Sequence, residues 1–388
     1  MATNAAKTLP PPGLQQEFRA VCPNGELRRA LFLANMICKG RKTLLLLSYV
    51  RLTLAGGVLS VDATDKDNAL ISTIAVESVG AGSVAAPTTA LLRIVSRLSG
   101  PIELEITPDD TALTIRGGDT TFSLSCMDAG DYDLLFTSAE CAPGFSLTTE
   151  EVCGLLRRTR HCVSTEETRY HLNGVHFFVA SGMLHSEATD GRRLARITIP
   201  APAGAGILPA HGVIIPKKTV RVLFEMLQRG DEPVAFAFSA DKLRGSFQRG
   251  HATLRAKMIN GTFPDVDRVI SKDNDKVATL DTKALAGLLH RVAAACSRND
   301  VGVRLTLTTG KLVVSVDRML WGSATGGMGA AYDGPRFEVG FNRRYLGDIL
   351  RVSGEQIRVA FSDQASPVLF TDPADPSCVH VLMPMRVV

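Results

Sequence analysis

Clustered aspartates are the residues whose spacing comes closest to that of a catalytic site. Asp62, Asp65 and Asp67 form one cluster, and Asp131 and Asp133 form another. Carboxylates grouped in this way can hold Mg²⁺ for the hydrolysis of a phosphodiester. Both clusters lie in turn-like stretches, however, where aspartates commonly cap backbone N–H groups. A metal-dependent nuclease that uses the first cluster is therefore the enzymatic alternative, while we expect no catalytic residue, no metal and no cofactor.

The usual signatures of nucleotide, zinc and hydrolase sites are absent from the sequence. It contains no GxxxxGK[ST], HExxH, GxSxG or paired CxxC motif. The eight cysteines have no CxxC spacing, so we interpret them as reduced thiols of a cytoplasmic protein. No apolar run approaches the about 18 residues of a membrane span. Residues 1–13 lack the apolar core of a signal peptide and are predicted to form a disordered tail.

The first aspartate cluster also contains a triplet that indicates how the chain is built. Ala-Thr-Asp occurs at 63–65 and again at 188–190, each time at the end of a strand-like run. A search for longer repeats finds three segments with the apolar stripe of an amphipathic helix, at 87–98, 216–227 and 341–352. In the third segment the stripe is predicted to comprise Tyr345, Ile349 and Val352. A second amphipathic helix recurs at 25–37, 147–162 and 280–296, with Thr148 and Asp281 as predicted N-caps.

Strand-like runs with turn signals lie between these helices. Pairs of strands joined by a glycine-containing turn are predicted at 50–63, 171–188 and 301–317. Longer meanders are predicted at 102–126 and 234–258. The chain is therefore predicted to be an α+β protein of three repeated domains, each with two helices and antiparallel sheets, at 14–143, 144–269 and 270–388.

Positive charge gathers on the repeated helices, although the net charge of the chain is only +4. Acidic residues are sparse there, and Asp348 is one of the exceptions. A single basic helix is commonly a solvated face, but basic residues on corresponding helices of three repeats favour contact with nucleic-acid phosphates. No base-reading motif accompanies them, so sequence-independent binding is predicted. A protein that binds the duplex from one side, without dimerising, is the alternative.

Several motifs give the chain a resemblance to a known family. They are RYHLNG (169–174), ATDGRRLA (188–195), FPDVDRVI (263–270), GFNRRY (340–345) and VLMPMRV (381–387). In order, spacing and three-repeat plan the chain resembles the bacterial sliding clamps, the beta subunits of DNA polymerase III. The resemblance implies a non-catalytic processivity factor of the cytoplasm and nucleoid: a head-to-tail homodimer that forms a six-domain ring around duplex DNA. It also implies that the replicative DNA polymerase, the clamp loader and other proteins with a clamp-binding motif are partners, and that no membrane is involved.

The resemblance further implies three sets of site residues. A partner-peptide pocket between the second and third domains would comprise Leu172, Thr189, Gly191, Arg192, Arg193, Leu194, Pro264, Arg268, Val269, Asn342, Tyr345, Val381, Met383, Pro384, Met385 and Arg386. The DNA-facing residues would be Arg41, Arg93, Arg97, Arg158, Arg160, Tyr170, Lys217, Lys218, Arg221, Arg291, Arg343 and Arg351. The dimer interface would include Phe122, Leu124, Ala294 and Ala295.

At several positions the sequence departs from the family's pattern. Arg192 stands where histidine is common, Asp300 stands where an aromatic residue would help to roof the pocket, and Ser271 replaces a proline. These departures predict an altered affinity for partners and leave the pocket itself in place. The small side chains of Ala294 and Ala295 predict a weaker or repacked dimer.

Overall fold

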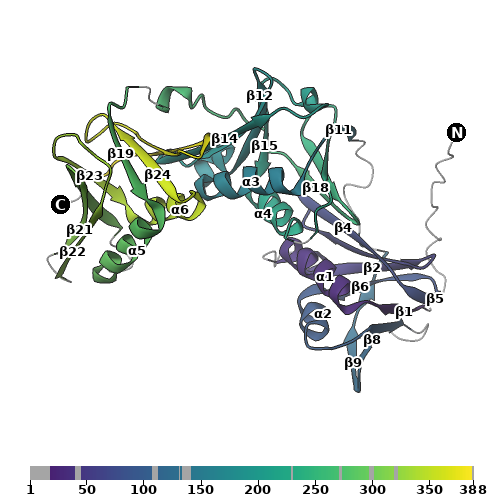
Figure 1. Ribbon diagram of the computed structural model, residues 1–388. Coiled ribbons are helices and arrows are strands. Elements are labelled where there is room, and N and C mark those ends of the chain that lie inside the picture. The colour runs from purple at the N-terminus through teal and green to yellow at the C-terminus, as the bar shows by residue number, and fades with distance from the viewer. Residues whose placement is uncertain are drawn as a thin grey trace. The chain divides into compact units, whose positions relative to one another are not determined.

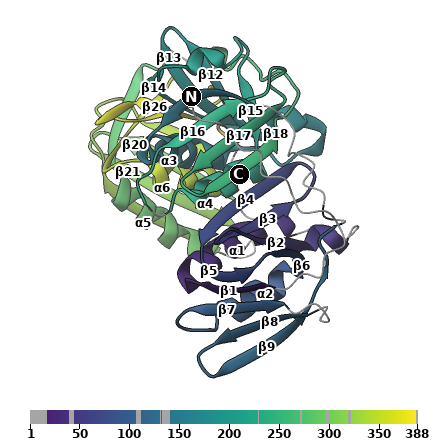
Figure 2. The same ribbon diagram turned by 90° about the vertical axis from the view of Figure 1, so that its right-hand side faces the viewer.

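The computed structural model describes residues 18–386, apart from 40–44, 107–111, 131, 133–140, 229, 271–272, 297–300 and 319–321. The chain divides into two compact units, of which one comprises Met1–Thr149 and Arg221–Lys257 and the other comprises Glu150–Val220 and Met258–Val388. Each unit combines helices with antiparallel sheets, as Figure 1 and Figure 2 show. The predicted α+β class is confirmed.

The first unit contains two sheets, and its helices α1 (Asn24–Cys38) and α2 (Thr88–Val95) pack on each other. The smaller sheet has the order β5 (Glu77–Gly80), β1 (Phe18–Cys22), β7 (Ile102–Ile106), β8 (Ala112–Gly117) and β9 (Thr120–Ser125). The larger sheet has the order β10 (Met127–Asp128), β6 (Gly82–Pro87), β2 (Tyr49–Ala55), β3 (Val58–Thr64), β4 (Asn68–Ala75), β18 (Ala252–Lys257), β17 (Arg244–Arg249), β16 (Val234–Phe238) and β11 (Ala142–Leu147). A short 3₁₀ turn, η1 (Leu45–Ser48), precedes β2.

The second unit contains an eight-stranded and a four-stranded sheet. The larger has the order β15 (Val213–Pro216), β12 (Gly174–Ala180), β13 (Met183–Thr189), β14 (Arg193–Pro200), β26 (Asp375–Leu382), β25 (Val368–Asp372), β24 (Gln356–Phe361) and β19 (Lys276–Asp281). The smaller has the order β22 (Gly322–Gly329), β21 (Lys311–Arg318), β20 (Gly302–Thr308) and β23 (Phe337–Asn342).

The remaining helices are α3 (Thr149–Thr159), α4 (Lys217–Met226), α5 (Thr282–Val292) and α6 (Arg343–Val352). Short 3₁₀ turns are η2 (Arg160–Cys162), η3 (Glu167–Leu172), η4 (Ala205–Ile207), η5 (Asp267–Val269) and η6 (Ala293–Ala295). In the second unit α5 and α6 pack side by side, and α5 also contacts β21 and β22. Leu285 of α5 and Ile349 of α6 are fully buried in the core that these elements share. Burial of such a side chain contributes about 1.5–3 kcal/mol.

Strand pairing joins the predicted repeats edge to edge. In the first unit β4, from the predicted first repeat, pairs with β18, from the predicted second. In the second unit β14 pairs with β26, so that Arg193 lies opposite Leu382 and Leu194 opposite Val381. The sheets therefore continue from one predicted repeat to the next, and the predicted boundaries near 143 and 269 stay predictions.

Each of the six predicted helical segments contains a helix, but the register of one was wrong. The predicted stripe of α6 was Tyr345, Ile349 and Val352, whereas the buried residues are Leu346, Ile349 and Leu350. The helix begins at Arg343 because the Asn342 side chain accepts a hydrogen bond from the Arg344 N–H at 3.0 Å. A gapless alignment of the three repeats contains no information about such a cap. The alignment therefore placed the start of α6 one residue too early.

Other local predictions are confirmed. Asp281 caps α5, since its carboxylate accepts a hydrogen bond from the Ala284 N–H at 2.7 Å. The three predicted strand pairs are β2–β3, β12–β13 and β20–β21. Their turns contain residues with positive φ, including Gly56 and Gly57 in the first, as a two-residue turn of the primed type requires.

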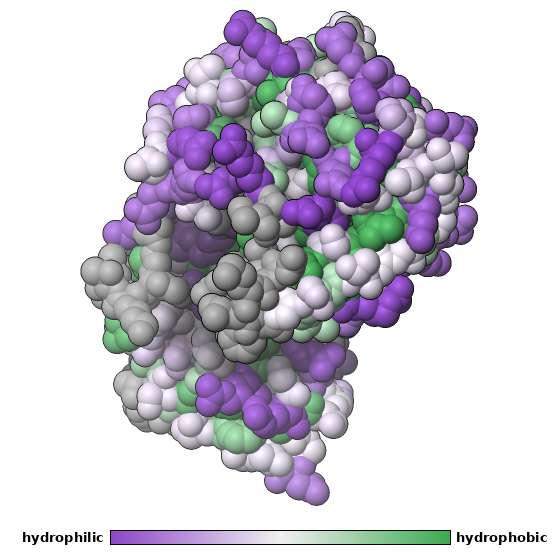
Figure 3. All heavy atoms as spheres, turned by 90° about the vertical axis from the view of Figure 1, so that its left-hand side faces the viewer, coloured by the Kyte–Doolittle hydropathy of each residue, from purple (hydrophilic) through white to green (hydrophobic). Residues whose placement is uncertain are grey.

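The surface offers no contiguous apolar face in the view of Figure 3, where hydrophobic residues form small areas between hydrophilic ones. No helix in the described part of the chain is long and apolar enough to cross a membrane. The eight cysteines are all free thiols, and burial raises the pKa of several, Cys378 to about 12.

Candidate functional site

The second Ala-Thr-Asp triplet forms the tight turn between β13 and β14. Asp190 Oδ1 accepts hydrogen bonds from the backbone N–H groups of Arg192 and Arg193, at 2.9 and 3.1 Å. Thr189 Oγ1 donates to the Arg193 carbonyl at 2.8 Å and accepts from the Gly191 N–H at 3.1 Å. Gly191 has a φ of +84°, a conformation that glycine adopts without steric cost. The Asp190 carboxylate therefore stabilises this turn.

The first triplet forms the same turn between β3 and β4, and its aspartates have structural partners. Asp65 Oδ1 accepts hydrogen bonds from the N–H groups two and three residues on, at 3.0 and 2.7 Å. The buried Asp62 pairs with Arg51 at 2.9 Å, and Asp67 pairs with Lys257 at 3.3 Å. Among the described residues no group of three His, Cys, Asp or Glu side chains is arranged to hold a metal ion. These carboxylates stabilise a turn and two strand pairs.

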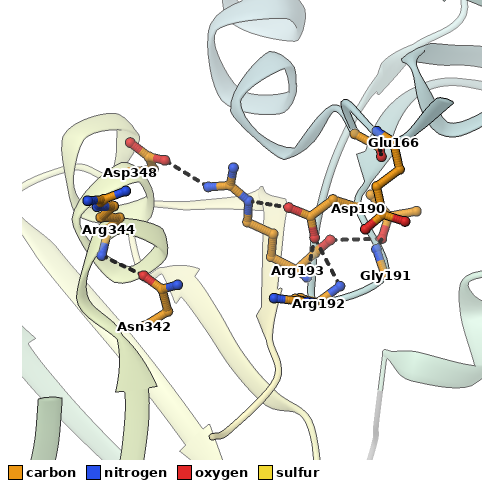
Figure 4. A network of polar contacts seen from close by, with 10 residues as sticks. Glu166, Asp190, Gly191, Arg192, Arg193, Asn342, Arg344 and Asp348 are labelled. Carbon is orange, nitrogen blue, oxygen red and sulfur yellow. Dashed lines mark hydrogen bonds and ion pairs between the residues drawn. The ribbon is translucent and has the colours of Figure 1, made fainter. Parts of the chain in front are cut away.

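Arg193 extends from the second turn across to α6, as Figure 4 shows. Its Nε lies 2.9 Å from Asp190 Oδ2, and its Nη1 lies 2.7 Å from Asp348 Oδ2. The guanidinium carbon lies 4.1 Å from the centre of the Tyr345 ring, within the range of a cation–π contact. The Arg193 side chain is only 11% exposed. This arginine therefore ties β14 to α6, and it is not a free donor at a pocket rim.

An apolar cluster lies below this turn. Leu172, Leu194 and Val381 are buried together, and they come from η3, β14 and β26. Three residues that the sequence analysis did not assign to the site complete the cluster: Ile214, Phe263 and Val266. The structure thus gathers predicted pocket residues from three separate stretches of the chain.

Exposed apolar side chains belong to the segments that border this cluster. Met383 and Met385 are each 36% exposed and Val269 is 37% exposed, which is unusual for large apolar residues. The Met383 N–H donates to the Arg192 carbonyl at 2.9 Å, and the Met385 N–H donates to the Gly340 carbonyl at 2.9 Å. These bonds hold the chain after β26 between the β13–β14 turn and β23. Methionine is flexible, so this surface can adapt to varied apolar side chains.

The other predicted pocket residues differ in exposure and in whether their side chains already have partners within the chain. Pro264, Arg268 and Arg386 are exposed, and Arg268 pairs with Asp265 at 3.2 Å. Pro384 is half-buried. Asn342 caps α6 as described above, so its side-chain oxygen is already engaged by the backbone.

Two neighbouring histidines of the same unit have lowered pKa values, the half-buried His161 in η2 and the buried His380 on β26. Their ring centres are 5.4 Å apart. Burial, together with nearby positive charge that includes Arg193, lowers the pKa of His161 to about 3. Burial and the neighbouring His161 lower the pKa of His380 to about 3 as well. Both rings are therefore neutral at ordinary pH.

The predicted DNA-facing residues fall into two groups. Arg93, Arg97, Tyr170, Lys217, Arg221, Arg291 and Arg351 are exposed, whereas Arg158, Arg160, Lys218 and Arg343 are half-buried. Arg158 forms an ion pair with Asp375, and Arg351 forms one with Asp348. The charges of Arg158 and Arg351 are therefore partly neutralised within the chain.

Two sheet edges carry the predicted dimer residues or lie beside them. Phe122 and Leu124 are half-buried on β9, which is at one edge of the five-stranded sheet among the described strands. Ala294 and Ala295 form η6 after α5, and η6 packs against β22, an edge strand of the four-stranded sheet as described. Edge strands present unpaired backbone groups that a second chain can bind.

Some predicted residues lie outside the described part of the chain, and the structure says nothing of them: Arg41, Asp131, Asp133, Ser271 and Asp300.

Comparison with known proteins places the chain in one family over most of its length. Residues 21–136, 146–265 and 267–386 match the N-terminal, central and C-terminal domains of the DNA polymerase III beta subunit. The beta sliding clamp of Caulobacter vibrioides (strain NA1000 / CB15N) is 38% identical over 368 residues, which cover 93% of this chain and 98% of that protein. The chain belongs to the beta sliding clamp family. The clamp of Escherichia coli K12 is 30% identical over 349 residues, covering 89% of this chain and 94% of the relative.

Solved clamp structures have the same fold. A crystal structure of the Caulobacter crescentus beta sliding clamp, with polyethylene glycol bound to its putative beta-motif tethering region, has a TM-score of 0.88 at 35% identity and covers 96% of this chain and 100% of that one. The sliding clamp of Bartonella birtlesii bound to griselimycin has a TM-score of 0.88 at 31% identity and covers 95% of this chain and 100% of that one. As a sliding clamp the protein is a non-catalytic processivity factor: a head-to-tail homodimeric ring that encircles duplex DNA and tethers the replicative polymerase through a peptide-binding pocket.

The residue that sequence reasoning missed most clearly in this clamp is Asp348. It stands out in the sequence as an acid on a basic helix, and the structure explains it as the partner of both Arg193 and Arg351. Strand β22, at one edge of the four-stranded sheet among the described strands, was also not predicted from the sequence. Its sequence GSATGGMG is rich in glycine, which weakens any strand signal.

Proposed function

We propose that this clamp docks partner peptides on the surface formed by the β13–β14 turn, the segment 263–269, the start of α6 and residues 381–386. The observation that carries the proposal is the combination of a buried apolar floor with exposed apolar side chains beside it. Leu172, Leu194 and Val381 form the floor, and Met383 and Met385 are partly exposed in the bordering segment. An incoming apolar side chain would gain a floor that is already ordered and desolvated.

The energetics favour weak and exchangeable docking. Burying one Leu or Phe side chain contributes about 1.5–3 kcal/mol. Two such anchors offset an association cost of about 4–15 kcal/mol only in part or by a small margin. A shared docking site requires this behaviour, because successive partners must replace one another. Tethering raises the effective concentration of polymerase at the primer end without new chemistry.

The test of the docking surface is a peptide titration with matched variants. Met383→Ala removes one exposed side chain of the surface, so we expect partner-peptide binding to weaken about 5- to 30-fold. Met127→Ala is the control, since Met127 is 38% exposed on β10. We expect griselimycin, the compound bound to the Bartonella birtlesii clamp, to compete with the peptide. Unchanged titrations for Met383→Ala would remove this surface from the proposal.

We propose in addition that the β9 edge of one protomer meets the β22 edge of its partner at the dimer interface. We also propose that the exposed arginines and lysines of the predicted DNA-facing set contact phosphates. Phosphate contacts of this kind carry no sequence information. A ring of this kind works at the nucleoid. The test is retention on DNA: the clamp should stay on closed circular duplex and slide off after linearisation. Equal retention on both forms would favour a protein that binds the duplex from one side.

A further inference from the structure

The charges around the proposed docking surface are unevenly matched. Five nearby acids each form an ion pair with an arginine of the same unit, through Arg169, Arg193, Arg196 or Arg268; they are Glu166, Asp190, Asp265, Asp267 and Asp348. Arg192 and Arg386 are exposed, and neither has an acidic partner among the described residues. Next to the exposed methionines, the unmatched charges among the described residues are therefore those of Arg192 and Arg386.

The backbone of Arg192 is held next to Met383 by two hydrogen bonds. Its N–H donates to Asp190 Oδ1 at 2.9 Å, and its carbonyl accepts from the Met383 N–H at 2.9 Å. The Asp190 carboxylate is occupied by the Arg193 guanidinium at 2.9 Å. In Figure 4 the dashed contact of Arg192 involves its backbone alone, whereas the guanidinium of Arg193 reaches both Asp190 and Asp348. The side chain of Arg192 thus starts from a fixed point beside Met383 and remains available to a ligand.

We propose that this clamp selects docking peptides that carry an acidic side chain beside their apolar anchors, and that Arg192 determines this selectivity. The inference rests on the docking surface proposed above and names the class of partner it takes. A carboxylate on the peptide would supply the acid that the described surface lacks at Arg192. Arginine suits this role because its planar guanidinium can donate two parallel hydrogen bonds to a carboxylate.

The expected selectivity is modest because the contact is solvent-exposed. Exposed ion pairs change binding by about 1.5- to 5-fold, and salt screens them. A charge at the rim of an interface also acts mainly on the association rate. Arg192 therefore ranks partners, while the apolar anchors supply most of the affinity.

Two peptides that differ only in charge test the inference. Both carry the same Leu and Phe anchors, which are flanked by aspartates in one peptide and by asparagines in the other. The full-length dimer should bind the aspartate peptide about 2- to 5-fold more tightly at about 50 mM salt and lose this preference at about 1 M, where the screening length is about 3 Å. Arg192→Gln should abolish the preference and Arg192→Lys should keep part of it. Arg358→Gln changes an exposed arginine of β24 outside the docking surface, so the preference should persist.

The outcomes separate this inference from the proposed function. Equal binding of both peptides by the unaltered clamp would overturn the inference and leave the docking surface standing. A preference that survives Arg192→Gln would overturn the role of Arg192. If neither peptide binds, the docking surface fails and the inference fails with it. If Arg192→Gln instead lowers retention on closed circular DNA and leaves the peptide preference intact, the arginine contacts phosphate and the inference is refuted.

Discussion

Asp348 receives two arginines whose burial differs, and this difference predicts how much each contributes to local stability. Arg193 is 11% exposed and lies 2.7 Å from Asp348 Oδ2, while Arg351 is 74% exposed and lies 2.8 Å from Oδ1. The same truncation, Arg→Gln, removes either partner from the same carboxylate. The two variants therefore compare a largely buried arginine, which also pairs with Asp190, with an exposed arginine at almost equal distance from Asp348.

Arg193→Gln should cost about 2–3 kcal/mol. Breaking a buried pair costs about 3–5 kcal/mol, but Asp348 is 24% exposed and retains Arg351, so solvent screens part of the loss. The lost contact with the Tyr345 ring adds to the cost, because a cation–π contact contributes about 0.5–2 kcal/mol. Arg351→Gln should cost about 0.2–0.5 kcal/mol, as exposed pairs within one helix do.

Hydrogen exchange of the amides in α6 and the β13–β14 turn measures this difference locally. It suits a multi-domain chain in which a single unfolding free energy is poorly defined. A cost of about 2–3 kcal/mol lowers protection about 30- to 150-fold, whereas the Arg351 variant should change it about twofold at most. Asp348→Asn combined with Arg193→Gln should cost little more than Arg193→Gln alone. Equal loss of protection in the two arginine variants would refute the assignment of Arg193 as the tie between β14 and α6.

Two further predictions follow from the same unit. Because the pKa of His161 and of His380 falls from 6.5 unfolded to about 3 folded, the unfolded chain binds protons first as pH falls below 6.5. The local free energy of unfolding around η2 and β26, measured by hydrogen exchange, should thus fall by up to about 1.4 kcal/mol per pH unit per histidine between pH 6 and 4, and replacing both histidines by Phe should flatten this dependence on pH. Gly191→Ala should destabilise its turn by about 1–2 kcal/mol, because φ is +84° and a Cβ there would lie 2.7 Å from the Arg169 guanidinium. Lys66→Gly should slightly stabilise the corresponding first turn, because Lys66 has a φ of +76°. Melting shifts of equal size and direction in the two variants would contradict this.

Local structure was largely predictable from the sequence. Helices, and pairs of strands joined by a turn, depend on patterns within about 10–18 residues. Each predicted segment contains the expected element. The exception is the start of α6, because the Asn342 side chain sets it and a comparison of repeats cannot detect a cap. The apolar floor was predicted in part: Leu172, Leu194 and Val381 came from the family resemblance, while Phe263 joined them only in the fold.

The polar half of the site could not be predicted in the same way. Arg192 and Arg193 are adjacent and chemically identical, and the family resemblance placed both in the partner-peptide pocket. The pleat of β14 and the pairing of β14 with β26 direct Arg193 to Asp348, 155 residues away, and leave Arg192 exposed. The partner of a charge depends on which strands meet, and that is decided by long-range packing.

By itself, then, the sequence determined the elements, the repeat and the family, because hydrophobic period and turn chemistry are local and the spacing of motifs can be compared along the chain without knowing which residues meet in space. The Ala-Thr-Asp turns illustrate the limit: both copies close by the same hydrogen bonds. Only the tertiary structure decided that the second turn borders the apolar cluster and that one of its two arginines is tied to α6. The physical reason is that burial and ion pairing depend on neighbours in space, which the order of residues does not contain.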